Sequence, residues 1–384
     1  MEYTYEDTPT VDTTDKATAI LKKYKEAVSV KDHWRDKFEE AYEYCLPNRE
    51  SFYEEAPGQK RTDKIFDETA VVGVQEFASR LQAGIVPTFA RWADFQAGSE
   101  IPQEQKPNIN LQLDKITDKQ LGFFWRPEEV DVSKDKKDFN ALTPNEQHIF
   151  TSNLKRQILL DSVQGRAPNL AFLPIVSLPE VENWIETWSF SETIHSRSYT
   201  HIIRNIYPDP SFVFDGLLEE KNIMDCGKSI AKYYDDLIIC NNGPTNKIDH
   251  KRAIWMALMS ANALEGVRFY VSFACSWAFA ELKKMEGNAK IIKLIARDEN
   301  VHLASTTTML KLLKKEDKDF EKIAKEMEQK CIDLYVEVID QEKEWAKYLF
   351  KNGSMIGLNE KILADYIEWI GCKRMRAIGL PCPY

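Results

Sequence analysis

The sequence predicts an all-α protein, and three observations support this fold class. After about residue 118, long segments with helical spacing of apolar residues follow one another with short breaks, and strand signals are almost absent. The composition, 43% hydrophobic and 29% charged, is typical of a globular protein with a large core. Two Glu-x-x-His patterns fall within these helical segments and hint at paired helices. The length of 384 residues suggests about two domains.

The first hundred residues predict a short, separate set of elements. Residues 1–15 are acidic and rich in Thr, and we expect them to be disordered. A helix is expected over 16–46, where Pro47 and Asn48 stop it, and another from Asp67 to near Pro87. The alternating stretch "RWADFQAG" predicts a strand, and "GSEIPQEQKPNINLQ" resembles a linker.

The remaining chain predicts a series of long helices. A Thr-Pro start with an acid in the first turn marks a helix at "TPNEQHIFTSNLKRQILLDSVQ". The next helix is expected to end before Pro208, and chain breaks are expected at "EGN" and "KNGS". The expected helices from there on cover about 178–206, 211–240, 248–285, 288–314, 317–350 and 359–378.

Charge and apolar patterning exclude several classes of function. The net charge of −10 and the pI of about 5.4 argue against a nucleic-acid or membrane surface. The most apolar run, residues 269–280, is too short to span a bilayer and is expected to be a buried core helix. The seven cysteines include no C-x-x-C pair, which favours reduced, packed thiols. With no secretory signal pattern at the N-terminus, we expect a cytoplasmic protein.

The two Glu-x-x-His patterns are Glu192 with His195 and Glu299 with His302. A spacing of three places each pair on one helix face, and Tyr199 follows His195 by one turn on the same face. The run before Glu192 is rich in apolar and aromatic residues, so an acid and an imidazole there need partners.

Two further acids, Asp161 and Glu265, lie inside apolar helical runs. Taken alone, each acid would pair with an arginine or face water, and Tyr199 alone would be a core tyrosine. Together, two helices that each supply a carboxylate and two that each supply Glu-x-x-His match the pattern of di-iron or di-manganese carboxylate bundles. Four buried carboxylates require cations to neutralise them. Carboxylates with two imidazoles suit iron or manganese rather than structural zinc, and the choice between those two stays open.

Apolar residues are expected to surround Tyr199. Two phenylalanines follow Glu265 by four and eight residues, and one isoleucine precedes Glu299 by four, so all three fall on the faces that carry the acids. They would form a dry pocket that protects an oxidised phenol. These residues are Phe269, Phe273 and Ile295.

Five stretches resemble the small subunit of aerobic class I ribonucleotide reductase over about 118–384: "FFWRPEEVDVS", "LLDSVQGRAPN", "FSETIHSRSYTHIIRN", "NALEGVRFYVSFACS" and "GNAKIIKLIARDENVHL". The resemblance implies a ferritin-like domain with two iron ions per chain, or manganese in their place, activated by dioxygen. It implies that Tyr199 forms a tyrosyl radical. The implied metal ligands are Asp161, Glu192, His195, Glu265, Glu299 and His302.

The resemblance also implies roles for residues around the metal ions and for partner proteins. Trp125 and Asp298 would carry the radical towards a large (alpha) subunit, and Trp188 would support the cluster from outside the ligand set. A homodimer is expected, and the large subunit would reduce ribonucleotides to deoxyribonucleotides. The small subunit itself would bind no nucleic acid, membrane or nucleotide.

Residues of about 20–105 resemble instead the start of a podovirus head-to-tail connector, or portal, protein. We therefore expect a portal-like fragment over 1–105, a junction over 106–117 and the reductase domain over 118–384. A viral gene would place the protein in the host cytoplasm. The competing functions are another di-iron oxygenase, an iron-storage protein, or a structural portal component.

The chain departs from the reductase family at its end. The family continues into a tail that docks on the large subunit and carries a relay tyrosine, whereas this sequence stops at "AIGLPCPY". Tyr384 is not assigned that relay role. The expectation is a chain that forms the radical but supports little ribonucleotide reduction.

Overall fold

The computed structural model describes residues 111–384 except 177, 216–219 and 244. The helices predicted over 16–46 and Asp67–Pro87, the strand at 91–98 and the linker that follows it lie outside the described residues. The described part is helical, as predicted, and apart from one isolated bridge between Met355 and Leu358 it contains no β-pairing.

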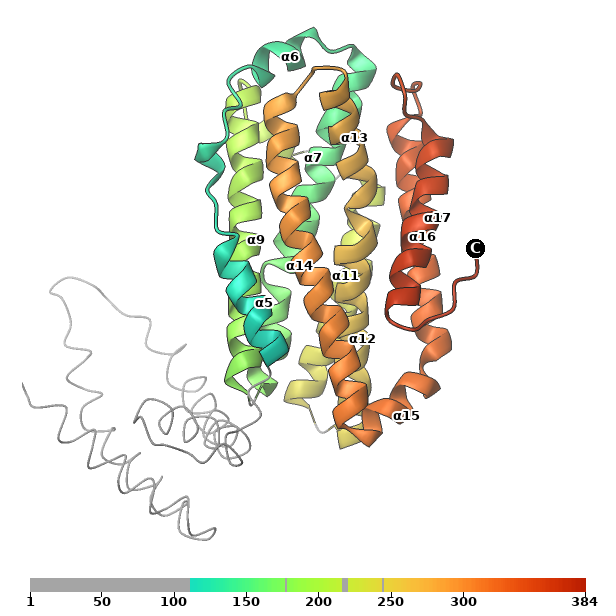
Figure 1. The fold of residues 1–384 in the computed structure, drawn as a ribbon. Coiled ribbons are helices and arrows are strands. Elements are labelled where there is room, and N and C mark those ends of the chain that lie inside the picture. The colour runs from blue at the N-terminus through green and yellow to red at the C-terminus, as the bar shows by residue number, and fades with distance from the viewer. Residues whose placement is uncertain (1–110, 177, 216–219, 244) are drawn as a thin grey trace, which may run out of the picture. The chain divides into compact units, whose positions relative to one another are not determined.

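Long helices run side by side as a bundle (Figure 1). The helix pair α16–α17 packs along one side of this bundle, and short segments connect the long helices. The long helices are α5 (Leu111–Gly122), α7 (Pro144–Gln164), α9 (Pro179–Ile206), α11 (Lys221–Asn242), α12 (Lys247–Ala263), α13 (Tyr270–Glu281), α14 (Glu286–Glu316), α16 (Glu328–Leu349) and α17 (Glu360–Ala377). The short ones are η2 (Pro127–Glu129), α6 (Asp135–Ala141), α8 (Ala167–Phe172), η3 (Leu173–Ile175), α10 (Ser211–Asp215), the π-helical η4 (Leu264–Arg268) and α15 (Lys318–Glu326).

Helices α7 and α9 begin where the sequence predicts. Thr143 caps α7 through the amide of Glu146, and the Glu146 carboxylate returns the contact to the Thr143 amide, which is a complete capping box. Helix α9 begins with Pro179 in its first turn and ends at Ile206, before Pro208.

The predicted break at 286–288 is wrong by a few residues. Residues 286–288 form the first turn of α14, and the break lies just before it, where Lys283 and Met285 adopt positive φ angles of 60° and 53°. The amides of that first turn have no partners within the helix and donate to Asp135 of α6, from Gly287 at 3.0 Å and from Asn288 at 2.5 Å. The acceptor that caps α14 therefore comes from a distant part of the chain, which local sequence does not reveal.

Three predicted helices are each divided in two. Helix α10 precedes α11 within 211–240, α15 and α16 meet at Met327, and the π-helical η4 separates α12 from α13. Apolar spacing predicts burial but does not distinguish the i→i−4 hydrogen bond of an α-helix from the wider turn of a π-helix. The π turn carries Glu265.

The apolar run 269–280 is a core helix, as predicted. It forms most of α13, and Phe273 and Phe279 are fully buried. Among the described helices, none is both long enough and apolar enough to cross a membrane. A buried ion pair between Arg156 and Glu342 joins α7 to α16, with the Arg156 guanidinium 4.7 Å from the Trp345 ring centre.

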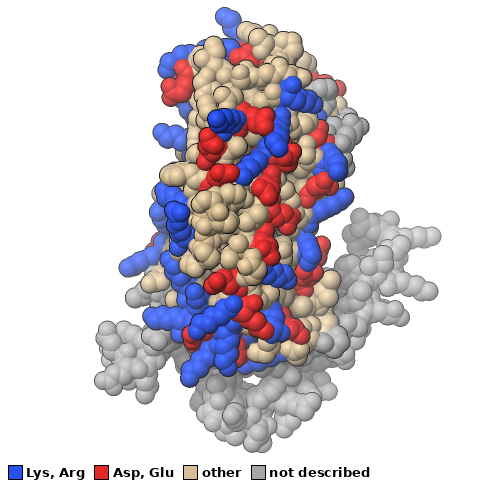
Figure 2. Space-filling model, turned by 90° about the vertical axis from the view of Figure 1, so that its right-hand side faces the viewer, with Lys and Arg blue, Asp and Glu red and all other residues tan. Residues whose placement is uncertain are grey.

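The prediction of reduced cysteines is wrong for one pair. Cys372 of α17 and Cys382 form a disulfide, with their Cα atoms 5.1 Å apart, because the chain turns back after α17 at Gly379, where φ is +84°. The returning segment reaches α16, where Lys343 lies 4.5 Å from the Tyr384 ring centre. Figure 2 shows this side of the molecule, on which acidic and basic side chains are interspersed. Within the described residues the free cysteines are Cys226, Cys240, Cys275 and Cys331.

Candidate metal centre

Four segments of the bundle bring the six predicted ligand residues together. Helix α7 supplies one acid, α9 and α14 each supply a Glu-x-x-His pair, and η4 supplies the last acid. All six side chains are buried, with no more than 1% of their surface exposed. The residues are Asp161, Glu192, His195, Glu265, Glu299 and His302.

The six residues form two overlapping groups, each with the composition of a metal site. In each group one ligand atom per residue can be chosen so that all lie within 4.8 Å of one another. Glu192 and Glu299 belong to both groups, so their carboxylates lie between the two. The first group adds Asp161 and His195, and the second adds Glu265 and His302.

The imidazole Nδ1 atoms face the carboxylates. His195 Nδ1 lies 3.2 Å from Glu299 Oε1, 3.3 Å from Glu192 Oε2 and 3.9 Å from Asp161 Oδ2. His302 Nδ1 lies 3.0 Å from Glu299 Oε2 and 3.1 Å from Glu192 Oε1. Both rings therefore aim the same nitrogen at the carboxylates that the two groups share.

Burial and mutual repulsion perturb the acids of this cluster. Burial raises the pKa of Asp161 well above its usual value, and the negative charges of Glu192 and Glu299 raise it further. Burial also raises the pKa of Glu265, with Glu299 the next cause. For His195, burial opposes the charged ring, yet the carboxylates of Glu299, Asp298 and Glu192 outweigh it and raise the pKa well above the usual value. Contacts with Glu265 and the two imidazoles instead lower the pKa of Glu299 despite its burial. Buried acids so close together need positive charge nearby, which metal ions can supply.

Several polar atoms of the cluster are buried without a hydrogen-bond partner among the described residues. They are both carboxylate oxygens of Asp161, Oε2 of Glu265, Oε1 of Glu299 and Nε2 of His302. Buried polar atoms normally have partners, and each of the two groups contains unpaired carboxylate oxygens that a cation could satisfy. The donor set of carboxylate oxygens and imidazole nitrogens fits iron or manganese.

Tyr199 is buried beside the first group. Its side chain is 1% exposed, and its hydroxyl lies near the Asp161 carboxylate without a hydrogen bond of 3.5 Å or less to any described residue. Burial raises the pKa of Tyr199 well above its usual value, and the charge of Asp161 adds to the effect. Phe269 and Phe273 stack with their ring centres 5.6 Å apart, and both are fully buried, as is Ile295.

A hydrogen-bonded path leads from the cluster to Trp125. The indole Nε1 of Trp125 donates to Asp298 Oδ2 at 2.7 Å, and the same oxygen lies 3.4 Å from His195 Nε2. Burial opposes ionisation of Asp298, but the contacts with His195 and Trp125 lower its pKa overall. Arg297 donates to the other oxygen of Asp298 at 3.0 Å. Our sequence interpretation missed Arg297, although its position next to Asp298 was a usable signal.

Two further residues contact the ligand carboxylates. Trp188 donates from Nε1 to Glu192 Oε1 at 3.2 Å. Gln164 donates from Nε2 to Glu265 Oε1 at 2.6 Å, and it was also missed, although it lies one helical turn after Asp161.

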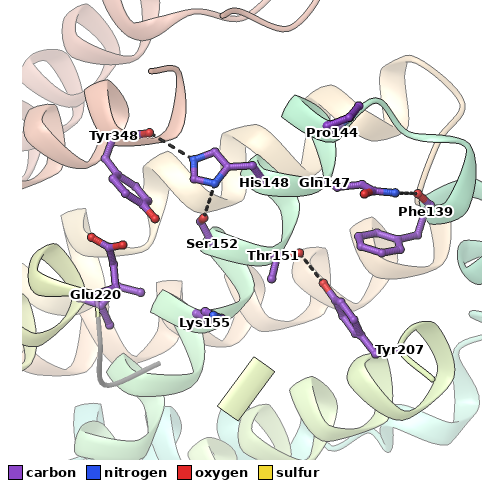
Figure 3. Close-up of a pocket in the computed structure, with 11 residues that line it drawn as sticks. Phe139, Pro144, Gln147, His148, Thr151, Ser152, Lys155, Tyr207, Glu220 and Tyr348 are labelled. Atoms are coloured by element: carbon purple, nitrogen blue, oxygen red, sulfur yellow. Dashed lines mark hydrogen bonds between the residues drawn. The ribbon is translucent and has the colours of Figure 1, made fainter. Parts of the chain in front are cut away.

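A separate surface pocket of about 440 Å³ contains none of the candidate ligands among its lining residues (Figure 3). His148 bridges Ser152 and the backbone oxygen of Tyr348, each at 3.4 Å, and Thr151 and Tyr207 hydrogen-bond to each other at 2.6 Å. Burial lowers the pKa of His148, so its ring is neutral near pH 7. These groups satisfy one another, and we assign the pocket no function.

Comparison with known proteins gives two family matches. The model of the ribonucleotide reductase small chain matches residues 110–384. The model of the bacteriophage head to tail connecting protein matches residues 17–126, which confirms the second resemblance seen in the sequence. The two matches overlap over 110–126.

Individual relatives agree with the longer match. The chain is 59% identical over 290 residues to the ribonucleoside-diphosphate reductase subunit beta of Buchnera aphidicola subsp. Baizongia pistaciae, covering 71% of this chain and 77% of the relative. It is 43% identical over 298 residues to the protein of the same name from Enterobacteria phage T4, with the same coverage of 71% and 77%. Among solved structures, it is similar to the ribonucleotide reductase R2 subunit from Clostridium botulinum, with a TM-score of 0.65, 28% identity, and coverage of 71% of this chain and 83% of that one.

The match over residues 110–384, the identity to the relatives, the helical fold and the buried cluster of carboxylates and histidines all point to one family. The chain belongs to the ribonucleotide reductase small-chain family.

Proposed function

We propose that this chain is the radical-generating small subunit of a class I ribonucleoside-diphosphate reductase. The observation that carries the proposal is the pair of four-residue groups that share Glu192 and Glu299 beside the buried Tyr199. Each chain would bind two iron ions, with manganese as the alternative, and dioxygen would activate the centre. The ligands would be the six clustered residues, with Asp161 and His195 at one ion and Glu265 and His302 at the other.

The bound ions would supply the oxidising power that removes one electron from Tyr199. The phenol would lose a proton together with the electron and become a neutral radical. Phe269, Phe273 and Ile295 would keep water and reductants away from it, since all three are fully buried. Trp188 would hold Glu192 in place through its indole N–H.

The path through Trp125, Asp298 and His195 would connect the centre to a large subunit. The large subunit would use the oxidising equivalent to reduce ribonucleotides, and the small subunit would act as a homodimer in the cytoplasm, that of the host if a phage encodes it. The chemistry would reside in residues 118–384, with 106–117 as a junction and 1–105 as a portal-like segment. Both Tyr199 and the Trp125–Asp298 contact favour this function over another di-iron oxygenase, which needs neither.

The test is to load the protein with iron(II) without oxygen, add dioxygen and record the electron paramagnetic resonance spectrum. A tyrosyl signal should appear in the wild type and be absent in Tyr199→Phe, while the iron content of the two proteins stays equal. An unchanged signal in Tyr199→Phe would assign the radical to another residue. No signal from a wild type that holds two iron ions would favour an oxygenase or storage function.

A further inference from the structure

We infer that Gln164 and Tyr234 are positioning residues that fix the carboxylate of Glu265 in the second metal group. The inference rests on the proposed function, because it concerns how one of the proposed ligands is held. Neither residue belongs to the two groups of clustered ligand residues.

Two consecutive hydrogen bonds connect α11 to the cluster through α7. The Tyr234 hydroxyl donates to Gln164 Oε1 at 3.0 Å, and Gln164 Nε2 donates to Glu265 Oε1 at 2.6 Å. All three side chains are buried, with at most 1% of their surface exposed. The ring of Phe172 packs edge-on against Tyr234, with the ring centres 6.1 Å apart, so the phenol is held by packing as well.

The direction of the first hydrogen bond determines the direction of the second. A glutamine amide has one end that donates and one that accepts, and it can turn end for end in a symmetric environment. Because Tyr234 donates to Oε1, the Nε2 end must face Glu265, and a donor there fixes the orientation of the carboxylate. Without the Tyr234 hydroxyl, the amide is free to turn its oxygen towards Glu265, where it would repel the carboxylate.

This arrangement leaves the other oxygen of Glu265 for the metal ion. Oε1 accepts from Gln164, whereas Oε2 has no hydrogen-bond partner among the described residues and lies 3.7 Å from His302 Nδ1. Glu265 also sits in the π-helical η4, and π turns of this kind are frequent at functional sites. The contact from Gln164 reaches the carboxylate from α7, outside η4.

The inference predicts an effect confined to one of the two ions. Glu265 belongs to the second group but not to the first, which consists of Asp161, Glu192, His195 and Glu299. Loss of a contact that orients a ligand typically lowers metal affinity about 10-fold to 100-fold. The affinity of the second ion should fall by that factor, and the affinity of the first should stay unchanged.

The experiment is an anaerobic titration of the full chain with manganese(II), in which the free ion is counted by electron paramagnetic resonance. The variants are Tyr234→Phe, Gln164→Leu and the double variant. The matched control is Tyr335→Phe, since the Tyr335 hydroxyl is equally buried and donates to the Asn262 amide oxygen at 2.6 Å. The Asn262 nitrogen donates to Thr306 and Thr307 rather than to a cluster carboxylate.

We expect two ions in the wild type and in Tyr335→Phe, with a dissociation constant for the second ion at least about 10-fold higher in Tyr234→Phe and in Gln164→Leu. The double variant should resemble Gln164→Leu, because Tyr234 acts through Gln164. Unchanged affinity in both single variants, additive losses in the double variant, or an equal loss in Tyr335→Phe would each overturn the inference. If one of the two single variants fails to fold, the dissociation constant of the second ion in the other variant decides the outcome. A wild type that binds less than one ion would instead refute the proposed function.

Discussion

At the scale of single residues, Asp298 shows how neighbours assign a role to a side chain. It is 4% exposed and contacts Trp125, Arg297 and His195 through its two oxygens. A buried carboxylate with three donors is fully satisfied and stays charged. It can therefore connect an indole to an imidazole without a bound ion of its own.

Replacement of Trp125 by phenylalanine removes one of these donors from a buried charge. We predict that Trp125→Phe lowers the free energy of unfolding of the metal-free protein by about 2–4 kcal/mol, from the lost hydrogen bond and the smaller ring. Urea denaturation measures this value. Trp369→Phe is the control, because Trp369 is 57% exposed, and its effect should stay below about 0.5 kcal/mol. Equal stabilities for the two variants would mean that the contact with Asp298 contributes little.

The residues that sequence reasoning found and missed differ in a physical way. The Glu-x-x-His pairs were found because their spacing places both ligands on one helix face, whatever the rest of the chain does. Gln164 and Arg297 were missed because neutral amides and arginines are common on helices, and only the partner across the bundle gives them a role. Tyr234 was missed for the same reason, since its partner is 70 residues away in the chain.

At the scale of elements, the position of α14, which carries two of the proposed ligands, depends on how the start of this helix packs. This helix carries Asp298, Glu299 and His302, and its first amides are capped by Asp135 of α6. The close approach requires a glycine: a Cβ at Gly287 would lie 2.7 Å from the backbone oxygen of Asp131.

We therefore predict that Gly287→Ala destabilises the protein by about 1–3 kcal/mol, because backbone atoms must move to accept the methyl group. Gly122 is the control, since a Cβ there meets nothing within 4 Å. Gly122→Ala should be neutral or stabilising by up to about 1 kcal/mol. Thermal or urea unfolding distinguishes the two, and a fully stable Gly287→Ala variant would show that α6 and α14 do not pack this closely.

The elements also show which structural features a local sequence pattern can predict and which it cannot. Helix α9 could be bounded to within a residue because Pro179 and Pro208 flank it. The π turn at η4 could not be predicted, because the apolar residues on either side of it keep the spacing of a regular helix. The Cys372–Cys382 disulfide could not be predicted either, since it depends on the reversal of the chain at Gly379 rather than on a cysteine motif.

At the scale of the whole molecule, every contact assigned to the cluster lies within one part of the chain. The proposed ligands, Tyr199 and the contacts from Trp125, Gln164 and Trp188 all fall between residues 125 and 302. We predict that deletion of residues 1–105 leaves metal binding unchanged at about two ions per chain. Metal analysis of the purified deletion variant, with gel filtration to confirm that it is not aggregated, measures the outcome. Aggregation or loss of metal would show that the segment covers apolar surface of the helical bundle.

The central claim is that two metal ions occupy the buried cluster. The most direct measurement is the iron content of the full chain after anaerobic loading and removal of unbound metal, compared with Glu265→Ala and Glu299→Ala. We predict about two ions in the wild type, about one in Glu265→Ala, and close to none in Glu299→Ala, because Glu299 belongs to both groups. Less than one iron per chain in a well-folded wild type, or two in Glu299→Ala, would contradict the account.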